Sequence, residues 1–184
     1  MQAVPLYDQR FLVDVDDVLA DLRPRFLEVV NDVTGVCLTP DDFISWDYGQ
    51  YLTPPQREQV NRILSSKGFC LALKPFPEAQ EAIRLLRERV KVFAVTWPAH
   101  GWFEERYEWL EKAYGLTVDD VILARSKYPV YGKWFLDDNP DNVETWARGN
   151  PGMTSMLWHT RATRDIGQHL FRVHSWDTIL DMVE

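Results

Sequence analysis

The segment Phe11–Asp21, with the sequence FLVDVDDVLAD, constrains the fold more than any other part of the chain. It begins with a short apolar run, which is typical of a buried strand in a parallel sheet. Asp14 and Asp16 follow this run, one residue apart. Since side chains alternate along a strand, both carboxylates are expected on the same side, at the carboxyl end of the strand. Open α/β sheets bind their ligands at that edge.

Two neighbouring carboxylates at a sheet edge repel each other unless a cation joins them. Mg²⁺ is held by oxygen ligands and suits a site with few carboxylates and a phosphate-bearing substrate. The segment has ordinary explanations too, because an aspartate after a strand often caps a helix or forms a turn. An EF-hand calcium loop is excluded, since Leu19 and Arg25 occupy its glycine and glutamate positions.

The composition bounds the class of protein and its partners. A chain of 184 residues, 46% hydrophobic and 26% charged, has room for one α/β core and an inserted subdomain. The net charge is −8, with acidic and basic residues interspersed, so no nucleic-acid or membrane partner is expected. The sequence shows no signal peptide or membrane-spanning stretch, and a cytoplasmic location is expected. The oligomeric state is not readable, and a homodimer is left open.

A helical insertion is expected after the first strand. Apolar residues between positions 22 and 33 recur at helical spacing and end near Gly35. A turn-rich aromatic stretch follows, and then Thr53 and Gln56 form a capping box that opens a second helix. Residues 21–73 are therefore predicted to form a small helical cap.

The rest of the chain alternates between amphipathic helices and short apolar strands. This alternation begins at the helix that Pro77 opens and continues to the C-terminus. It favours a parallel sheet with crossover helices. We therefore predict a Rossmann-like α/β core formed by residues 1–20 and 74–184.

Three of the later strands end in polar residues. Val90–Val95 is followed by Thr96, Val121–Ala124 by Arg125, Ser126 and Lys127, and Trp134–Leu136 by Asp137 and Asp138. Each group alone has an ordinary explanation: a strand-end hydroxyl, a surface lysine, or a helix N-cap. Because every group directly follows its own apolar strand, we expect all of them at one sheet edge, beside Asp14 and Asp16.

The order of these residues resembles the haloacid dehalogenase (HAD) superfamily of phosphohydrolases, which implies the HAD fold. Within it, the chain is similar to the 5'(3')-deoxyribonucleotidase family of nucleoside monophosphate phosphatases. The closer likeness rests on the stretches LVDVDDVLAD, KGFCLALKPFPEA, ERYEWLEKAYG, ARSK and HSWDTILD, and on the ten residues from Lys127 to Asp137. It covers nearly the whole chain and is weakest in the aromatic insertion.

This resemblance implies a catalytic role for four residues. Asp14 would attack phosphorus and form an aspartyl-phosphate. Asp16 would protonate the departing sugar oxygen and then accept a proton from the attacking water. Thr96 would donate a hydrogen bond to a phosphate oxygen, and Lys127 would neutralise the charge on the phosphate.

The resemblance also implies Mg²⁺ as the cofactor. Asp14 and Asp138 would bind the metal through their side chains, with Asp137 as the alternative to Asp138. Asp16 would bind through its backbone carbonyl. Mg²⁺ and Lys127 together are expected to keep Asp14 ionised.

The substrate is expected to be a small phosphate ester, a nucleoside monophosphate, contacted by aromatic residues of the insertion. Trp46 and Phe69 lie nearest to where family members place aromatics that contact the base. Trp97 stands where a small hydroxyl residue is usual, and Asp17 stands where glycine is usual. These departures affect the preference for base and sugar rather than the phosphate chemistry.

Two alternatives stay open. One is an HAD phosphatase that acts on another phosphomonoester, a sugar phosphate or a DNA 3'-phosphate, although the low positive charge disfavours DNA. The other is a nucleotide-binding protein without turnover, which the intact acidic and basic motif residues disfavour. The sequence does not decide between 5' and 3' phosphates, between ribose and deoxyribose, or among bases.

Overall fold

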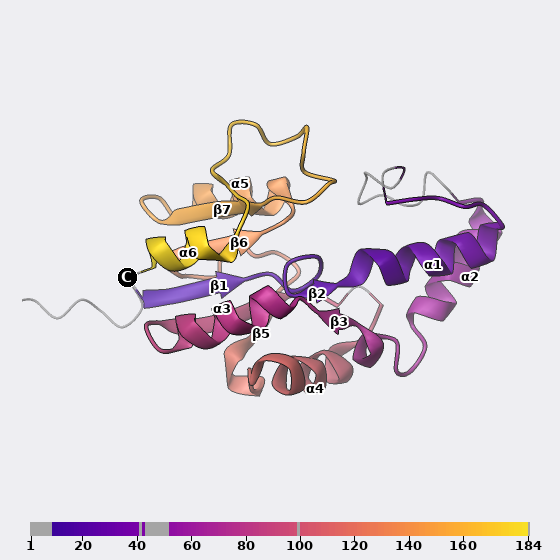
Figure 1. Cartoon of the computed structure of the whole chain (residues 1–184), viewed down its shortest axis with the longest axis horizontal. Helices are drawn as coiled ribbons and strands as arrows, with labels where there is room; N and C mark the ends of the chain where they lie inside the picture. Colours follow the sequence, from indigo (N-terminus) through magenta and orange to yellow (C-terminus); the bar gives the residue numbers. More distant parts are fainter. Residues whose placement is uncertain (1–8, 41, 43–51, 99, 184) are drawn as a thin grey trace, which may run out of the picture.

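The computed structural model describes residues 9–40, 42, 52–98 and 100–183, and a six-stranded sheet forms its centre (Figure 1). The strands are β1 (Arg10–Val13), β4 (Lys91–Thr96), β5 (Val121–Leu123), β6 (Trp134–Asp137), β7 (Thr154–Trp158) and β8 (Arg172–Val173). They lie in the order β5-β4-β1-β6-β7-β8, and every neighbouring pair is parallel. The predicted parallel α/β sheet is confirmed.

The central strands separate two apolar cores. Phe11 and Val13 of β1 belong to one core, whereas Leu12 between them belongs to the other. The first core includes side chains of α3 (Pro77–Arg87), α4 (Phe103–Tyr114) and α6 (Trp176–Met182), and the second includes side chains of α5 (Pro140–Gly149). Because both faces of the sheet are covered, its strands are apolar at nearly every position.

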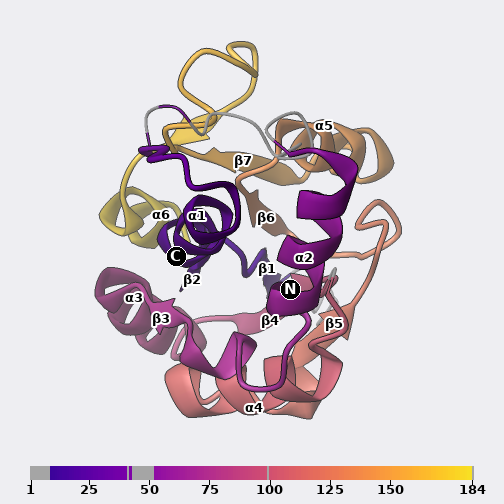
Figure 2. The ribbon, with the colours of Figure 1, turned by 90° about the vertical axis from the view of Figure 1, so that its right-hand side faces the viewer.

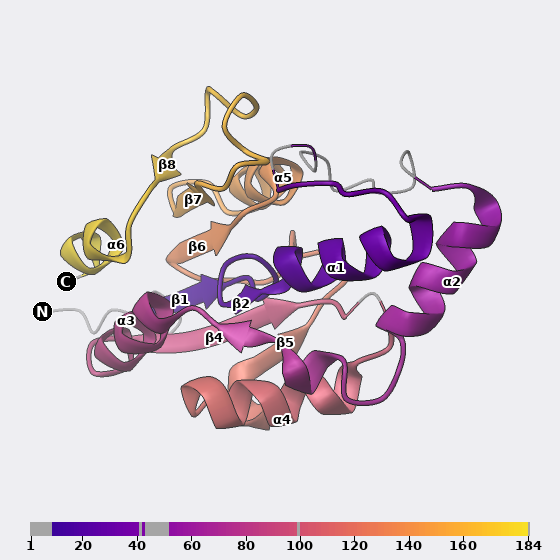
Figure 3. The same cartoon turned by 45° about the vertical axis from the view of Figure 1, so that its right-hand side comes forward.

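Two helices, α1 (Leu22–Thr34) and α2 (Pro54–Leu64), pack against each other beyond the carboxyl ends of the strands (Figures 2 and 3). Helix α1 ends at Gly35, which adopts the left-handed conformation that glycine favours, with φ of 69°. Helix α2 begins with the predicted capping box of Thr53 and Gln56. Both helices therefore start or stop where the sequence predicts.

The chain crosses between the sheet and the α1–α2 pair at one place. Strands β2 (Ala20–Asp21) and β3 (Lys74–Pro75) pair in antiparallel fashion there. Short 3-10 turns, η3 (Cys70–Ala72) and η4 (Val118–Asp120), precede β3 and β5. None of the helices in the described ranges has the length and apolar character needed to span a bilayer.

Candidate active site

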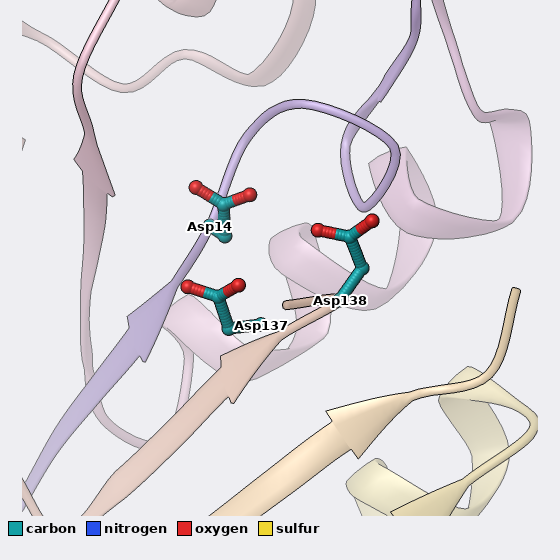
Figure 4. A group of neighbouring side chains, drawn as sticks. All are labelled: Asp14, Asp137 and Asp138. Atoms are coloured by element: carbon teal, nitrogen blue, oxygen red, sulfur yellow. The ribbon is translucent and has the colours of Figure 1, made fainter. Parts of the chain in front are cut away.

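The carboxyl ends of β1 and β6 bring three aspartates together. These strands are neighbours, and the backbone N–H of Asp14 donates to the carbonyl of Leu136 at 2.8 Å. One carboxylate oxygen each of Asp14, Asp137 and Asp138 lies within 4.8 Å of the others, and the three carboxylates face a shared space (Figure 4). Residues more than a hundred positions apart in the chain thus form one oxygen-rich group, which we call the three-carboxylate group.

Lys127 follows β5 and is buried against this group. Its ammonium contacts a carboxylate oxygen of Asp14 and donates to Oδ2 of Asp137 at 2.7 Å. Burial lowers the pKa of Lys127, but the two carboxylates outweigh burial, and the net change is upward. Lys127 is therefore a fixed positive charge between two anions.

The carboxylate of Asp137 accepts several hydrogen bonds from within the protein. Besides Lys127, its carboxylate accepts from the backbone N–H of Asn139 at 2.8 Å and from the amide of Asn142 at 3.1 Å. Asn142 lies in α5, and sequence reasoning did not identify it. These donors take up most of the hydrogen-bonding capacity of the Asp137 carboxylate.

The charges of the three-carboxylate group are not balanced by Lys127 alone. Burial raises the pKa of Asp14 from 3.8 to about 7, and the lowering effect of Lys127 offsets this only in part. Burial and the neighbouring carboxylates also raise the pKa of Asp138 well above its ordinary value. A further cation beside these carboxylates would favour their ionised forms.

The predicted motif residues line a single cavity of about 340 Å³. Its lining includes Asp14, Asp16, Asp17, Leu22, Thr96, Trp97, Arg125, Lys127, Asp137, Asp138 and Asn142. Thr96, the last residue of β4, is almost completely buried, whereas Trp97 is 44% exposed. The structure thus brings together the strand-end residues that the sequence pattern placed at one edge.

Asp16 differs from Asp14 in its partner. Nη2 of Arg106, a residue of α4, donates to the two carboxylate oxygens of Asp16 at 2.7 and 3.0 Å. Sequence reasoning missed Arg106, because it lies among glutamates in the stretch EERYEWLEK. Its spacing could have indicated that it is buried. Arg106 is four residues after Trp102 and three before Trp109, which places it on the buried face of α4.

Asp17 adopts a backbone conformation that few residues other than glycine adopt, with φ of 58°. Aspartate tolerates this left-handed conformation better than most side chains. Oδ1 of Asp17 accepts from the backbone N–H of Arg23 at 3.1 Å, and Oδ2 accepts from its Nη2 at 2.8 Å. Burial raises the pKa of Asp17 to about 6 against the opposing effect of Arg23. The contacts with Arg23 hold the Asp17 side chain while its backbone adopts this conformation.

The two aromatics proposed to contact a base are not part of this cavity's described lining. Phe69 is 5% exposed, and its ring stacks on Trp102 at a centroid distance of 5.4 Å. The guanidinium carbon of Arg25 lies 5.6 Å from the centre of the same ring. Trp46 lies outside the described residues. Contact of either residue with a substrate stays a prediction.

A larger cavity, of about 520 Å³, lies between α3 and α6. Three carboxylates line it, those of Glu78, Glu81 and Asp177, together with apolar side chains such as Trp158 and Trp176. No lysine or arginine is found among the residues described in its lining. The smaller cavity at the strand ends, where Lys127 and Arg125 accompany the motif aspartates, is therefore the candidate active site.

Solved structures of other proteins share this fold. A hydrolase of the haloacid dehalogenase-like family from Streptococcus pneumoniae matches with a TM-score of 0.66 and 9% identity, covering 97% of this chain and 99% of that one. An identity this low concerns the fold alone. The fold is that of the HAD-like hydrolases.

Sequence comparison narrows this class. Residues 9–184 match the family described as 5' nucleotidase, deoxy (pyrimidine), cytosolic type C protein. The mitochondrial 5'(3')-deoxyribonucleotidases of Homo sapiens and Mus musculus are 32% and 31% identical over 185 residues, covering 91% of this chain and 78% and 81% of theirs. The chain belongs to this 5'-nucleotidase family and is a phosphoric monoester hydrolase. The resemblance drawn from the motifs is confirmed.

Proposed function

We propose that this phosphatase is an Mg²⁺-dependent 5'(3')-deoxyribonucleotidase, which hydrolyses deoxynucleoside monophosphates through an aspartyl-phosphate. The observation that carries the proposal is the contact of buried Lys127 with Asp14, in a cavity that Thr96 and the three-carboxylate group also line. The substrate class is supported by the names of the human and mouse relatives.

In the first step, a carboxylate oxygen of Asp14 attacks phosphorus. The new O–P bond forms while the bond from phosphorus to the sugar oxygen breaks. Asp16 gives its proton to that oxygen, so the nucleoside leaves as a neutral alcohol. Lys127 and Thr96 stabilise the charge that spreads over the other phosphate oxygens.

In the second step, a water molecule attacks phosphorus in the aspartyl-phosphate. Asp16, now a carboxylate, accepts a proton from this water. The bond between Asp14 and phosphorus breaks, inorganic phosphate leaves, and both carboxyl groups return to their starting forms. Burial of Lys127 and Thr96 keeps their charge and dipole in place during both steps.

The residues of the site fit a divalent cation. The three-carboxylate group offers hard oxygen donors whose excess negative charge Lys127 does not balance. The side chains of Asp14 and Asp138 and the backbone carbonyl of Asp16 would hold Mg²⁺, with Asp137 as the alternative to Asp138. When bound, Mg²⁺ would supply positive charge next to the phosphate oxygens.

We propose that residues 21–73 form a cap over a core of residues 1–20 and 74–184. The position of α1 and α2 beyond the strand ends, and the pairing of β2 with β3 at their base, support this division. Trp46, Phe69 and Trp97 would contact the nucleoside, where base stacking on an aromatic ring contributes roughly 1–3 kcal/mol.

A substrate panel tests the proposal. Purified protein with Mg²⁺ would be offered deoxyribo- and ribonucleoside 5'- and 3'-monophosphates, sugar phosphates, and DNA ending in a 3'-phosphate. We expect the fastest phosphate release from deoxynucleoside monophosphates, and none after chelation of the metal. Preference for a sugar phosphate or DNA end would identify a different HAD phosphatase. Nucleotide binding without phosphate release would identify a protein that has lost turnover.

The location and partners are part of the same proposal. We propose a cytoplasmic enzyme that acts on small molecules and has no nucleic-acid or membrane partner. The human and mouse relatives carry the word mitochondrial in their names, so fractionation of cells that express this protein is the direct test.

A further inference from the structure

Arg106 is a buried cation without a role in the steps above. It lies in α4 with no solvent exposure, and Nη2 donates to both carboxylate oxygens of Asp16. Arginine is rarely found fully buried unless it is paired. The pairing here is with the residue that we assign to proton transfer.

The surroundings of the Arg106 guanidinium are otherwise apolar. Its carbon lies 5.6 Å from the centre of the Trp102 ring and 6.0 Å from that of Trp109. Within the described part of the chain, Nε and Nη1 have no hydrogen-bond partner. Burying such N–H groups costs free energy, and an apolar side chain of similar volume would often be at least as stable. Burying the charged Arg106 is therefore unfavourable for folding. Its ion pair with Asp16 offsets part of this unfavourable free energy.

Arg106 reaches the active site only through Asp16, as far as the described residues define the cavity. The Asp16 side chain is 29% exposed and lines the cavity, whereas Arg106 does not line it. A group in this place does not touch a substrate. It acts by deciding where the Asp16 carboxylate lies.

The Asp16 carboxylate could also pair with other cations. Lys127 lines the same cavity, and an Mg²⁺ ion held by the three-carboxylate group would lie in it too. A carboxylate next to a cation tends to pair with it or coordinate it. An Asp16 carboxylate paired with those charges would be less available to exchange a proton with the substrate.

We infer that Arg106 is a positioning residue, which holds the Asp16 carboxylate apart from Lys127 and the metal-binding aspartates and so reserves it for proton transfer. The inference rests on the proposed function. It assigns the two buried cations of the site different tasks: Lys127 serves the nucleophile and phosphate, and Arg106 serves the acid and base.

The dependence of the first turnover on the leaving group tests this inference. A sugar oxygen is a poor leaving group and needs a proton, whereas p-nitrophenolate leaves without one. In a rapid-mixing experiment, we expect Arg106→Met to slow the release of deoxynucleoside by about 10- to 100-fold. The first equivalent of p-nitrophenolate from p-nitrophenyl phosphate should slow by less than about threefold.

Three further variants keep the test sharp. Arg106→Lys preserves a positive charge and should recover part of the deoxynucleoside rate, and it serves if Arg106→Met does not fold. Adding Arg106→Met to Asp16→Asn should slow deoxynucleoside release no further, because both changes remove one function. Tyr114→Phe, eight residues beyond Arg106 in α4, removes the hydrogen bond that the Tyr114 hydroxyl donates to the Leu19 carbonyl at 2.6 Å and serves as the control. It should lower the Tm without changing the ratio of the two rates.

The outcomes separate this inference from the proposed function. Equal slowing of both substrates in the Arg106 variants, or no slowing of either, would show that Arg106 is only structural and would overturn the inference. A wild-type protein inactive on all phosphate esters would overturn the proposed function and the inference together.

Discussion

The site contains two buried cations with different surroundings. Lys127 contacts two carboxylates, those of Asp14 and Asp137, with Asp138 close by. Arg106 contacts one carboxylate, that of Asp16, and otherwise lies against aromatic rings. The region around Lys127 therefore has an excess of negative charge, whereas the region around Arg106 is balanced.

This difference in charge predicts that the carboxylates around Lys127 bind a further cation, whereas the Arg106–Asp16 pair does not. A region with excess negative charge gains free energy when a further cation enters, and its protonation changes with that cation. A balanced pair attracts a further cation much less, so the position of the Asp16 side chain beside Arg106 should change little when a cation binds. The two regions should respond differently to the same kind of substitution.

The largest effect is expected from Asp14→Asn. The change keeps the shape of the side chain but removes the oxygen nucleophile, so kcat should fall by more than about 10⁴-fold. Phosphate release from a deoxynucleoside monophosphate measures it, at enzyme concentrations high enough to detect a slow rate. A kcat within tenfold of wild type would show that Asp14 is not the nucleophile.

Lys127→Ala comes next. Loss of a preorganised charge at the phosphate should lower kcat/KM by about 10²- to 10³-fold. Lys133→Ala is the matched control, because Lys133 is an exposed lysine a few residues further along the chain. If the two variants lose similar amounts of activity, the region around Lys127 does not act on the phosphate.

Removing a carboxylate should change the Tm in opposite directions in the two regions. In chelator at pH 8, Asp16→Asn leaves the buried charge of Arg106 without its carboxylate, and about 2 kcal/mol or more of stability should be lost. This corresponds to a Tm lower by about 4–8 °C for a chain of this size. Asp14→Asn relieves the excess charge around Lys127 and should raise the Tm. Thermal unfolding of both variants beside wild type decides this, and a shift in the same direction would contradict the comparison.

The smallest effect is a pH dependence of stability without metal. The folded protein holds a proton on Asp14 up to pH about 7, whereas the unfolded chain releases it near 3.8. The stability that this proton contributes is fully present below about pH 3.8, is lost progressively as the pH rises from there to about 7, and is absent above that pH. We expect the Tm of chelated wild type to fall more steeply between pH 5 and pH 7 than the Tm of Asp14→Asn, and the two curves to run parallel above that range. Saturating Mg²⁺ should flatten the wild-type curve, and curves without metal that also run parallel between pH 5 and pH 7 would contradict the assignment.

The motif residues could be predicted because each directly follows an apolar strand. Thr96 ends β4, Asp137 ends β6, and Asp14 follows β1, which lies between these two strands in the sheet. Parallel pairing then places all three at one edge, so periodicity and strand order contain most of the information on the site. The bounds of α1 and α2 were similarly readable from Gly35 and the capping box.

The partners of these residues could not be predicted in the same way. Arg106 pairs with Asp16 across ninety positions of sequence, and nothing in a charged helix says which cation turns inward. The hydrogen bonds of Asn142 to Asp137 likewise depend on how α5 lies beside β6. The packing of Phe69 on Trp102 is a third example, because an aromatic ring in a helical insertion fits a binding surface and a core equally well.

The pairing of β2 with β3 has a consequence for how the molecule could be altered. Ala20 lies opposite Pro75, so the chain enters and leaves the segment that contains α1 and α2 at adjacent points. Because β2 and β3 hold the two ends of this segment together, the length of the segment adds little loop-closure entropy to the free energy of folding. Residues 22–73 are thus a natural unit for exchange: a graft from another protein, with ends equally close, would test whether this unit decides which substrate is recognised, while the aspartates at the strand ends keep their positions.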